Sequence, residues 1–125
     1  MIEIHPLRDK CSLADYYISA KVDMNDNSMA VVATDGDEVI GNCLFDMNDD
    51  NIMIHHLEPT NDRFFADGLL RSALHVGVEN GKMLAFYSEN SLYTLFNSLG
   101  FIKNAEKNEL NVEKLFSSCQ NCEKE

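Results

Sequence analysis

The strongest fold signal in this chain is the stretch Val-Val-Ala-Thr-Asp-Gly-Asp-Glu-Val-Ile-Gly at residues 31–41. Its Asp-Gly centre favours a tight hairpin, because glycine readily adopts the positive φ that such turns need. The apolar runs on either side predict paired strands over Met29–Ala33 and Glu38–Phe45. A further apolar run predicts a third strand of this meander over Asn51–Leu57.

Helices and strands are also expected on both sides of the meander. Alternation predicts a first strand over Ile2–Pro6, and apolar residues at helical spacing predict a helix over Ser12–Ala20 with Ser12 as its N-cap. A longer helical period begins at about Phe64 and is stopped by Asn80-Gly81. The remaining expected elements are a strand over Met83–Tyr87, a short helix over Ser91–Leu99, paired strands at 101–102 and 108–110, and a helical turn within 112–117.

This order of elements predicts a single α/β domain. A strand–helix–strand crossover next to an antiparallel meander gives a mixed, mostly antiparallel central sheet with helices on both faces, an α+β arrangement. The chain has 125 residues, which is the length of one domain. We expect the domain to span residues 1–118 and a polar tail to occupy 119–125.

The charge of the chain limits its partners. Its formal net charge is −11 and its pI is about 4.6, whereas nucleic-acid-binding proteins usually carry a basic face. We therefore expect no nucleic-acid partner, and an acidic surface that is compatible with a cationic amine. No apolar run approaches the roughly 20 residues of a membrane helix, and the N-terminus has no signal-peptide core. No membrane partner and a cytoplasmic location are expected.

The four cysteines should be reduced in such a compartment. Cys119 and Cys122 have the spacing of half a zinc site, but nothing near them supplies the other half. We expect a reduced tail and no metal centre. Metal binding together with a histidine, or a disulfide formed on oxidation, are the alternatives.

Four local motifs occur in the order and near the spacing of one protein family. The hairpin at 31–41 is followed by Leu57-Glu58-Pro59 at the end of a strand, by Glu79-Asn80-Gly81 at the end of a helix, and by the Leu-Phe-Asn-Ser-Leu-Gly-Phe run at 95–101. Over about residues 29–104 the chain resembles the GNAT N-acetyltransferase superfamily, as a short member with altered motifs. The resemblance implies an N-acyltransferase that uses acetyl-CoA as cosubstrate and an amine as acceptor.

The resemblance also implies a loop that binds the diphosphate of coenzyme A at the start of the long helix, where free N–H groups attract anions. The family pattern Gln/Arg-x-x-Gly-x-Gly/Ala fits in two registers, Asn61-x-x-Phe64-x-Ala66 or Arg63-x-x-Ala66-x-Gly68. The first register keeps the spacing from the loop to the helix end at Asn80-Gly81. The second register matches the residue types of the family pattern more closely. The implied coenzyme-binding residues are Leu57, Asn61, Arg63, Phe64, Phe65, Ala66, Asp67, Gly68 and Phe96.

Several of these positions depart from the family pattern. Phe64 replaces the central glycine of the first register, and Asp67 is acidic close to the expected phosphate. Phe96 stands where the family commonly has a tyrosine whose phenol can protonate the leaving thiolate, and phenylalanine cannot do so. Tyr93, one turn before Phe96, and Glu89, where the family often has asparagine, are further candidates to face the groove.

The candidate proton acceptors lie on the third strand of the meander. The resemblance implies that the backbone N–H near Leu57 polarises the thioester carbonyl. Since adjacent strand residues point to opposite faces, His56 and Glu58 are expected on one face, and Met53, His55 and Leu57 on the other. A neutral histidine suits an ammonium acceptor, so His56 is the candidate base, with Glu58 beside it.

Two functions are compatible with the sequence. The first is acetyl transfer from acetyl-CoA to an amine. The second is a catalytically weak or inactive GNAT-like domain that binds coenzyme A or a protein. The short segment before the hairpin predicts an acceptor side that is open or completed by a second subunit, and an exposed apolar sheet edge is compatible with a homodimer.

Overall fold

The computed structural model describes residues 2–116, so the expected tail and its two cysteines lie outside the described residues. The elements, in chain order, are β1 (Ile2–Pro6), α1 (Lys10–Ala20), β2 (Ser28–Asp35), β3 (Glu38–Met47), β4 (Asn51–Glu58), α2 (Arg63–Glu79), β5 (Leu84–Tyr87), the short helix η1 (Asn90–Leu92), α3 (Tyr93–Ser98), β6 (Ile102–Asn104), the short helix η2 (Ala105–Lys107) and β7 (Glu109–Leu110).

The strands form one mixed sheet in the order β1-β2-β3-β4-β5-β7-β6. Neighbouring strands are antiparallel except β4 and β5, which are parallel and are connected through α2. In the β2–β3 hairpin Asp35 pairs with Glu38, and Gly36 in the turn has a φ of 64°. The predicted crossover beside an antiparallel meander is therefore confirmed.

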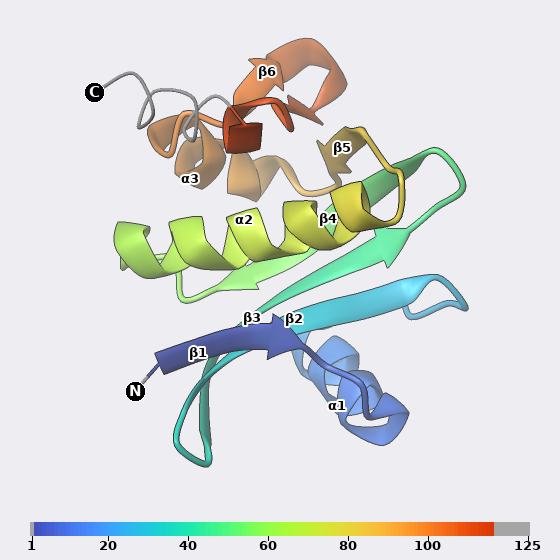
Figure 1. Cartoon of the computed structure of the whole chain (residues 1–125), viewed down its shortest axis with the longest axis vertical. Helices are drawn as coiled ribbons and strands as arrows, with labels where there is room; N and C mark the ends of the chain where they lie inside the picture. Colours follow the sequence, from blue (N-terminus) through green and yellow to red (C-terminus); the bar gives the residue numbers. More distant parts are fainter. Residues whose placement is uncertain (1, 117–125) are drawn as a thin grey trace.

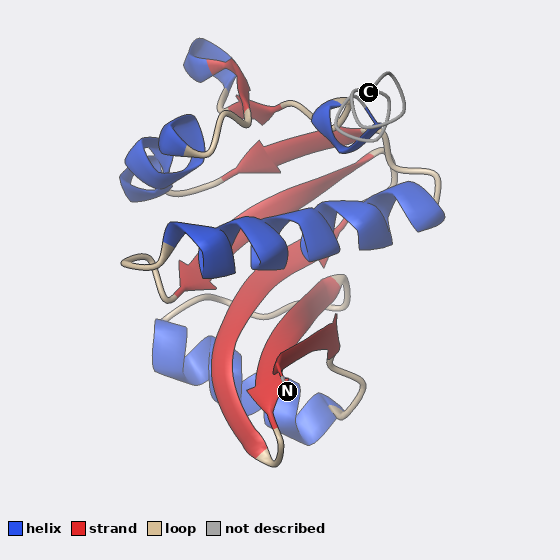
Figure 2. Ribbon diagram, turned by 60° about the vertical axis from the view of Figure 1, so that its left-hand side comes forward, coloured by secondary structure: helices blue, strands red, loops and turns tan. Residues whose placement is uncertain are grey.

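Helices cover both faces of the sheet, as Figures 1 and 2 show. The buried side of α2, which includes Leu69, packs on one face and forms the main core with the inward side chains of the strands. On the opposite face, Leu13 and Tyr17 of α1 form a smaller core with Ala30 and Leu44. Among the described residues, no helix has both the length and the apolar character needed to cross a bilayer.

Two local expectations need correction. Helix α1 begins at Lys10 with Asp9 as its N-cap, because the Asp9 carboxylate accepts the N–H of Cys11 at 3.1 Å. Ser12 is therefore not the cap, and its hydroxyl donates to the same carboxylate at 2.8 Å. The helix expected over Ser91–Leu99 is divided into η1 and α3. The final helical turn occupies 114–116.

Tyr17 connects α1 to the sheet through its buried hydroxyl. The oxygen lies 2.7 Å from the carbonyl oxygen of Met29 and 3.0 Å from that of Phe45, on neighbouring strands. Burial raises the pKa of Tyr17 to about 12. The folded protein therefore keeps this phenol neutral in a pH range above 10 in which the unfolded chain ionises it.

Replacing Tyr17 with phenylalanine should lower the free energy of unfolding by about 1–2 kcal/mol near neutral pH, because two buried carbonyls lose their donor. The wild-type protein then loses stability as the pH rises from about 10 to about 12, because its folded-state pKa is raised, and the variant lacks this loss. The free energies of unfolding of the wild type and the variant should therefore converge between pH values of about 10 and about 12. Urea unfolding at neutral and alkaline pH measures this, with Tyr16→Phe on the same helix as control. A difference that stays constant with pH would contradict the assignment.

Candidate functional site

The parallel strands β4 and β5 pair over only part of their length. Residues Asn51–Ile54 pair with Leu84–Tyr87, and the N–H of Ser88 donates to the carbonyl of Ile54 at 2.9 Å. Beyond this bond β4 continues to Glu58, while the chain after β5 turns into η1. The two strands therefore part, and the unpaired edge of β4 presents backbone N–H and C=O groups.

A β-bulge at His55 determines which side chains of β4 share a face. The pairs with β3 pass directly from Ile54 to His56 and leave His55 as the extra residue. Both histidines consequently line one pocket on the α1 side. Leu57 instead packs with Ile54 in the main core. The expected grouping of Leu57 with Met53 and His55 is therefore wrong, because a bulge interrupts strict alternation.

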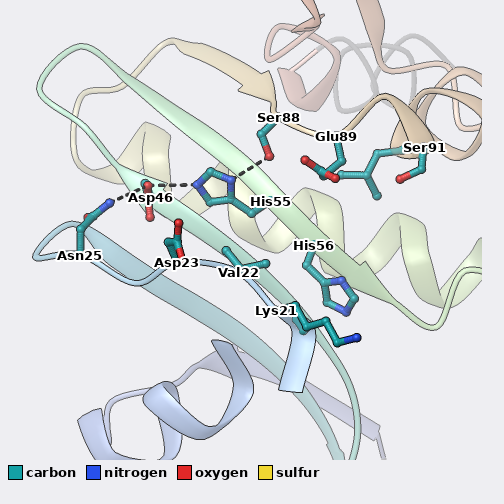
Figure 3. Close-up of a pocket in the computed structure, with 12 residues that line it drawn as sticks. Lys21, Val22, Asp23, Asn25, Asp46, His55, His56, Ser88, Glu89 and Ser91 are labelled. Atoms are coloured by element: carbon teal, nitrogen blue, oxygen red, sulfur yellow. Dashed lines mark hydrogen bonds and ion pairs between the residues drawn. The ribbon is translucent and has the colours of Figure 1, made fainter. Parts of the chain in front are cut away.

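A pocket of about 500 Å³ lies on the α1 side, next to the point where β4 and β5 part (Figure 3). Its walls come from the loop after α1, the end of β3, the middle of β4 and the segment after β5. The lining residues are Ala20, Lys21, Val22, Asp23, Asn25, Asp46, His55, His56, Ser88, Glu89, Ser91 and Leu92.

The pocket has an excess of negative charge. The carboxylates of Asp23, Asp46 and Glu89 line it, against the single ammonium of Lys21. Such a lining attracts a cationic ligand. Within residues 2–116, no group of three or more His, Cys, Asp or Glu side chains could hold a metal ion.

His56 and Glu58 lie on the same face of β4, as alternation predicted. The Nε2 atom of His56 is 3.5 Å from Oε1 of Glu58, and the same Oε1 accepts a hydrogen bond from Nδ2 of Asn42 at 3.0 Å. Among the described residues, Nδ1 of His56 has no hydrogen-bond partner. The carboxylate can therefore orient the ring and leave the other nitrogen available to a ligand.

His55 is held by hydrogen bonds at both ring nitrogens. Its Nε2 lies 3.0 Å from Oδ2 of Asp46, and its Nδ1 lies 2.8 Å from Oγ of Ser88 (Figure 3). The Asp46 carboxylate also accepts hydrogen bonds from Ser28 at 3.0 Å and from Asn25 at 3.1 Å. This row of side chains crosses from β3 over β4 to the end of β5.

Glu89 and Tyr93 occupy different places. Glu89 lines the pocket and precedes η1 without capping it. Tyr93 begins α3, is 38% exposed, and does not belong to the lining of that pocket. It lies near Tyr87, whose pKa is raised by burial and, to a smaller extent, by the charge of Tyr93.

Phe96 lies in the main core and not in the pocket. Its side chain is fully buried, and its ring meets Tyr87 edge-on at a centroid distance of 5.6 Å and an angle of 81°. This geometry is typical of aromatic pairs that stabilise a core. Phe96 can offer a ligand neither a proton nor an exposed surface.

The start of α2 is open to solvent but already capped. The carboxylate of Asp62 accepts the N–H of Phe65 at 3.1 Å, and its carbonyl accepts that of Ala66 at 2.9 Å. The first N–H groups of a helix have no intrahelical partner, so those of Arg63 and Phe64 remain for a ligand. The Phe64 side chain is 91% exposed and does not fill the core beneath this end.

The two registers for a diphosphate loop differ in where they fall on α2. The stretch Asn61–Ala66 spans the capped N-terminus, whereas Gly68 faces β1, where an added Cβ would lie 3.0 Å from Cδ1 of Ile4. The close approach to β1 thus gives Gly68 a structural role of its own.

Three further side chains at this end of α2 make structural contacts. Asp67 forms an ion pair with Arg71 at 2.7 Å, one turn further along the helix. Arg63 donates to the carbonyl of Ser98 at the end of α3. Phe65 packs on β3, where a Cβ added at Gly41 would lie 3.0 Å from its ring.

Sequence reasoning missed Asp46, Ser88 and the loop from Lys21 to Asn25. These residues are far apart in the chain, and the bulge that brings His56 onto the same face as His55 depends on pairing between strands. The only sequence signal was the pair of adjacent histidines, since one of two neighbours on a regular strand would otherwise face a core.

Comparisons with known proteins identify the fold. No family model and no curated protein matches the sequence. A GNAT-family protein from Desulfovibrio desulfuricans matches in structure with a TM-score of 0.59 and 12% identity, over 83% of this chain and 87% of that chain. The ribosomal-protein-S18-alanine N-acetyltransferase from Escherichia coli matches with a TM-score of 0.57 and 12% identity, over 87% and 88%.

A GNAT-family acetyltransferase from Streptococcus pneumoniae matches with a TM-score of 0.55 and 20% identity, over 82% of this chain and 88% of that chain. Matches at sequence identities this low show a common fold, and they do not identify a substrate. The matched fold of this chain is a mixed sheet with one parallel strand pair, β4–β5, and helices on both faces. This chain has the fold of the GNAT acetyltransferases.

Proposed function

We propose that this protein transfers an acetyl group from acetyl-CoA to the nitrogen of an amine. The observation that supports this most strongly is the parting of β4 and β5 after Ile54 and Tyr87. A polar pocket with two histidines lies on one face at this point, and α2 covers the other face. An acyl donor inserted between the strands would thus bring its thioester to the pocket.

The donor side fits acetyl-CoA in part. The amides of Arg63 and Phe64 would hold the diphosphate, in the register Asn61–Ala66, and the backbone N–H of Leu57 would polarise the thioester carbonyl. Phe64 leaves the approach open, because its side chain points to solvent. The carboxylate of Asp62 opposes binding, because it caps the same helix end with a negative charge.

His56 would act as the general base. It would remove a proton from the acceptor's ammonium group, with Glu58 orienting the ring. The amine nitrogen would then form a bond to the carbonyl carbon while the carbon–sulfur bond breaks. The nitrogen would lose its remaining surplus proton to water, which leaves a neutral amide. Phe96 supplies no proton, so coenzyme A would leave as its thiolate, with the side chain of Glu89 at the pocket wall.

The acceptor side favours an amine. The pocket lining is acidic. Beside Glu58, Oδ1 of Asn42 is buried without a hydrogen-bond partner among the described residues. Asn42 and Glu58 both line a second hollow of about 370 Å³. An ammonium group brings three donors, which suit these oxygens.

The test is a reaction of the protein with acetyl-CoA and a panel of amines that includes a diamine, an amino sugar and a short peptide. The expected result is release of free thiol that depends on the amine, together with an N-acetylated product in the mass spectrum. A calorimetric titration that shows no binding at millimolar acetyl-CoA would overturn the proposal.

A second function, a coenzyme-binding or protein-interaction domain without catalysis, is favoured by two observations. Asp62 occupies the helix end that an active site needs for a diphosphate, and Phe96 offers no acid. Binding of acetyl-CoA without thiol release across the amine panel would support this function over the first.

Replacing Asp62 with asparagine should tighten binding of coenzyme A by about fivefold, since one like charge about 5 Å from a phosphate costs about 1 kcal/mol. Asparagine caps helices as well as aspartate does, so the unfolding temperature should stay within a few degrees. Titration calorimetry at low and high salt measures the effect, which should shrink with salt.

The matched control for this charge removal is Asp50→Asn. Asp50 is exposed at the opposite end of β4, about 26 Å away by strand geometry. Coenzyme affinity that rises equally in both variants would reflect net charge alone. Unchanged affinity in Asp62→Asn would place the diphosphate elsewhere.

A further inference from the structure

We propose that Ser88 is a nucleophile activated by His55 and Asp46, so that the site hydrolyses activated acyl esters through an acyl-Ser88 intermediate. The three side chains form a continuous hydrogen-bonded row with distances of 3.0 Å and 2.8 Å. The inference rests on the proposed function in one respect, that the natural acyl donor is a thioester. The hydrolysis itself requires no amine.

The chemistry of the row assigns the direction of proton transfer. An ionised carboxylate can only accept hydrogen bonds, so the hydrogen between Asp46 and His55 belongs to Nε2. Nδ1 of His55 then carries the lone pair, and it accepts the hydroxyl hydrogen of Ser88. This is the arrangement in which a histidine base can remove the proton of a serine nucleophile.

Partial burial and further hydrogen bonds hold the three side chains of the row in place. The side chains of His55 and Asp46 are 18% and 11% exposed, and Ser28 and Asn25 fix the carboxylate through two further hydrogen bonds. The backbone of Ser88 is fixed by the bond from its N–H to Ile54. The histidine therefore keeps one ring orientation and one tautomer.

The position of Ser88 favours a chemical role over a purely structural one. It is the first residue beyond the last β4–β5 pair, and it lines the pocket. An acyl group that entered between the strands as far as their last backbone bond would lie beside Ser88, whereas Nε2 of His56 is directed to Glu58. The unpaired edge of β4 beside it offers backbone donors to a developing oxyanion.

The reaction balances in two steps. In the first step, Oγ of Ser88 forms a bond to the carbonyl carbon and gives its proton to Nδ1 of His55. The carbon–sulfur bond then breaks, and the thiolate takes that proton from His55 and leaves as a thiol. Water then attacks the ester while His55 takes its proton. The carbon–oxygen bond breaks and Oγ of Ser88 recovers the proton, so thioester and water become carboxylic acid and thiol.

The test uses the full chain with a fluorophosphonate, which phosphonylates activated serines, and with 4-nitrophenyl acetate as an aryl ester. Peptide mass spectrometry should find the phosphonyl group on Ser88. Ser88→Ala should remove both the adduct and the ester hydrolysis. The control Ser72→Ala, on α2 across the sheet, should label as the wild type does. His55→Gln keeps the serine and should label at least about 100-fold more slowly.

Wild-type protein without an adduct at Ser88 after exhaustive labelling would overturn the inference, whatever the variants do. So would a Ser88→Ala variant that hydrolyses the ester at the wild-type rate. Neither reagent contains coenzyme A or an amine, so the two proposals fail separately. Amine acetylation without a Ser88 adduct retains the proposed function alone, and an adduct without amine acetylation retains this inference alone.

Discussion

Replacing His56 with alanine should lower the turnover of acetyl-CoA and amine by about 10²–10⁴-fold, the usual contribution of a general base. The affinity for coenzyme A should stay within about twofold, because the loss of a base acts on the transition state rather than on donor binding. The amine would have to lose its proton to water. Thiol release under saturating donor, combined with a binding titration, separates the two quantities.

His75→Ala is the control for this substitution. His75 is exposed on α2 and forms an ion pair with Glu79 at 3.9 Å. Turnover in this variant should equal that of the wild type. If His56→Ala kept its turnover while Ser88→Ala lost it, the base would be His55, acting through the Ser88 row.

Replacing Phe96 with alanine should lower the free energy of unfolding by about 3–5 kcal/mol, the range for truncating a fully buried phenylalanine. The cost combines the lost burial with a cavity against Tyr87, whose edge-on contact disappears. For a domain of typical stability this is a large share of the total. The midpoint of urea unfolding measures the effect.

Phe64→Ala provides the matched comparison, since the same atoms are removed from a side chain that is 91% exposed. Its stability should change by less than about 0.5 kcal/mol. Similar losses in the two variants would contradict the placement of Phe96 in the core. If Phe64 covers a bound diphosphate, its removal would appear as weaker coenzyme affinity with unchanged stability.

The candidate site was predictable only where local pattern determines it. His56 and Glu58 were expected on one face of β4 and lie there, at 3.5 Å. Leu57 was expected beside His55 and lies in the core instead. Alternation along one strand describes a regular ladder, and the bulge arises only when β3 pairs with β4.

The start of α2 shows a second limit of sequence reasoning. Two loop registers fitted the sequence, Asn61–Ala66 and Arg63–Gly68, because residue types alone cannot decide between neighbouring positions. In the structure α2 begins at Arg63 with Asp62 as its N-cap, and Gly68 lies against Ile4 of β1.

By itself the sequence determined the order of strands and helices, the hairpin at Asp35-Gly36, the mixed sheet and the apolar faces of the helices, because periodicity and turn chemistry act over a few neighbouring residues. Only the tertiary structure decided that Asp46, His55 and Ser88 form one row and that Asp62 blocks part of a helix end. Those contacts join distant segments, and they form only when the strands pair, bulge and part.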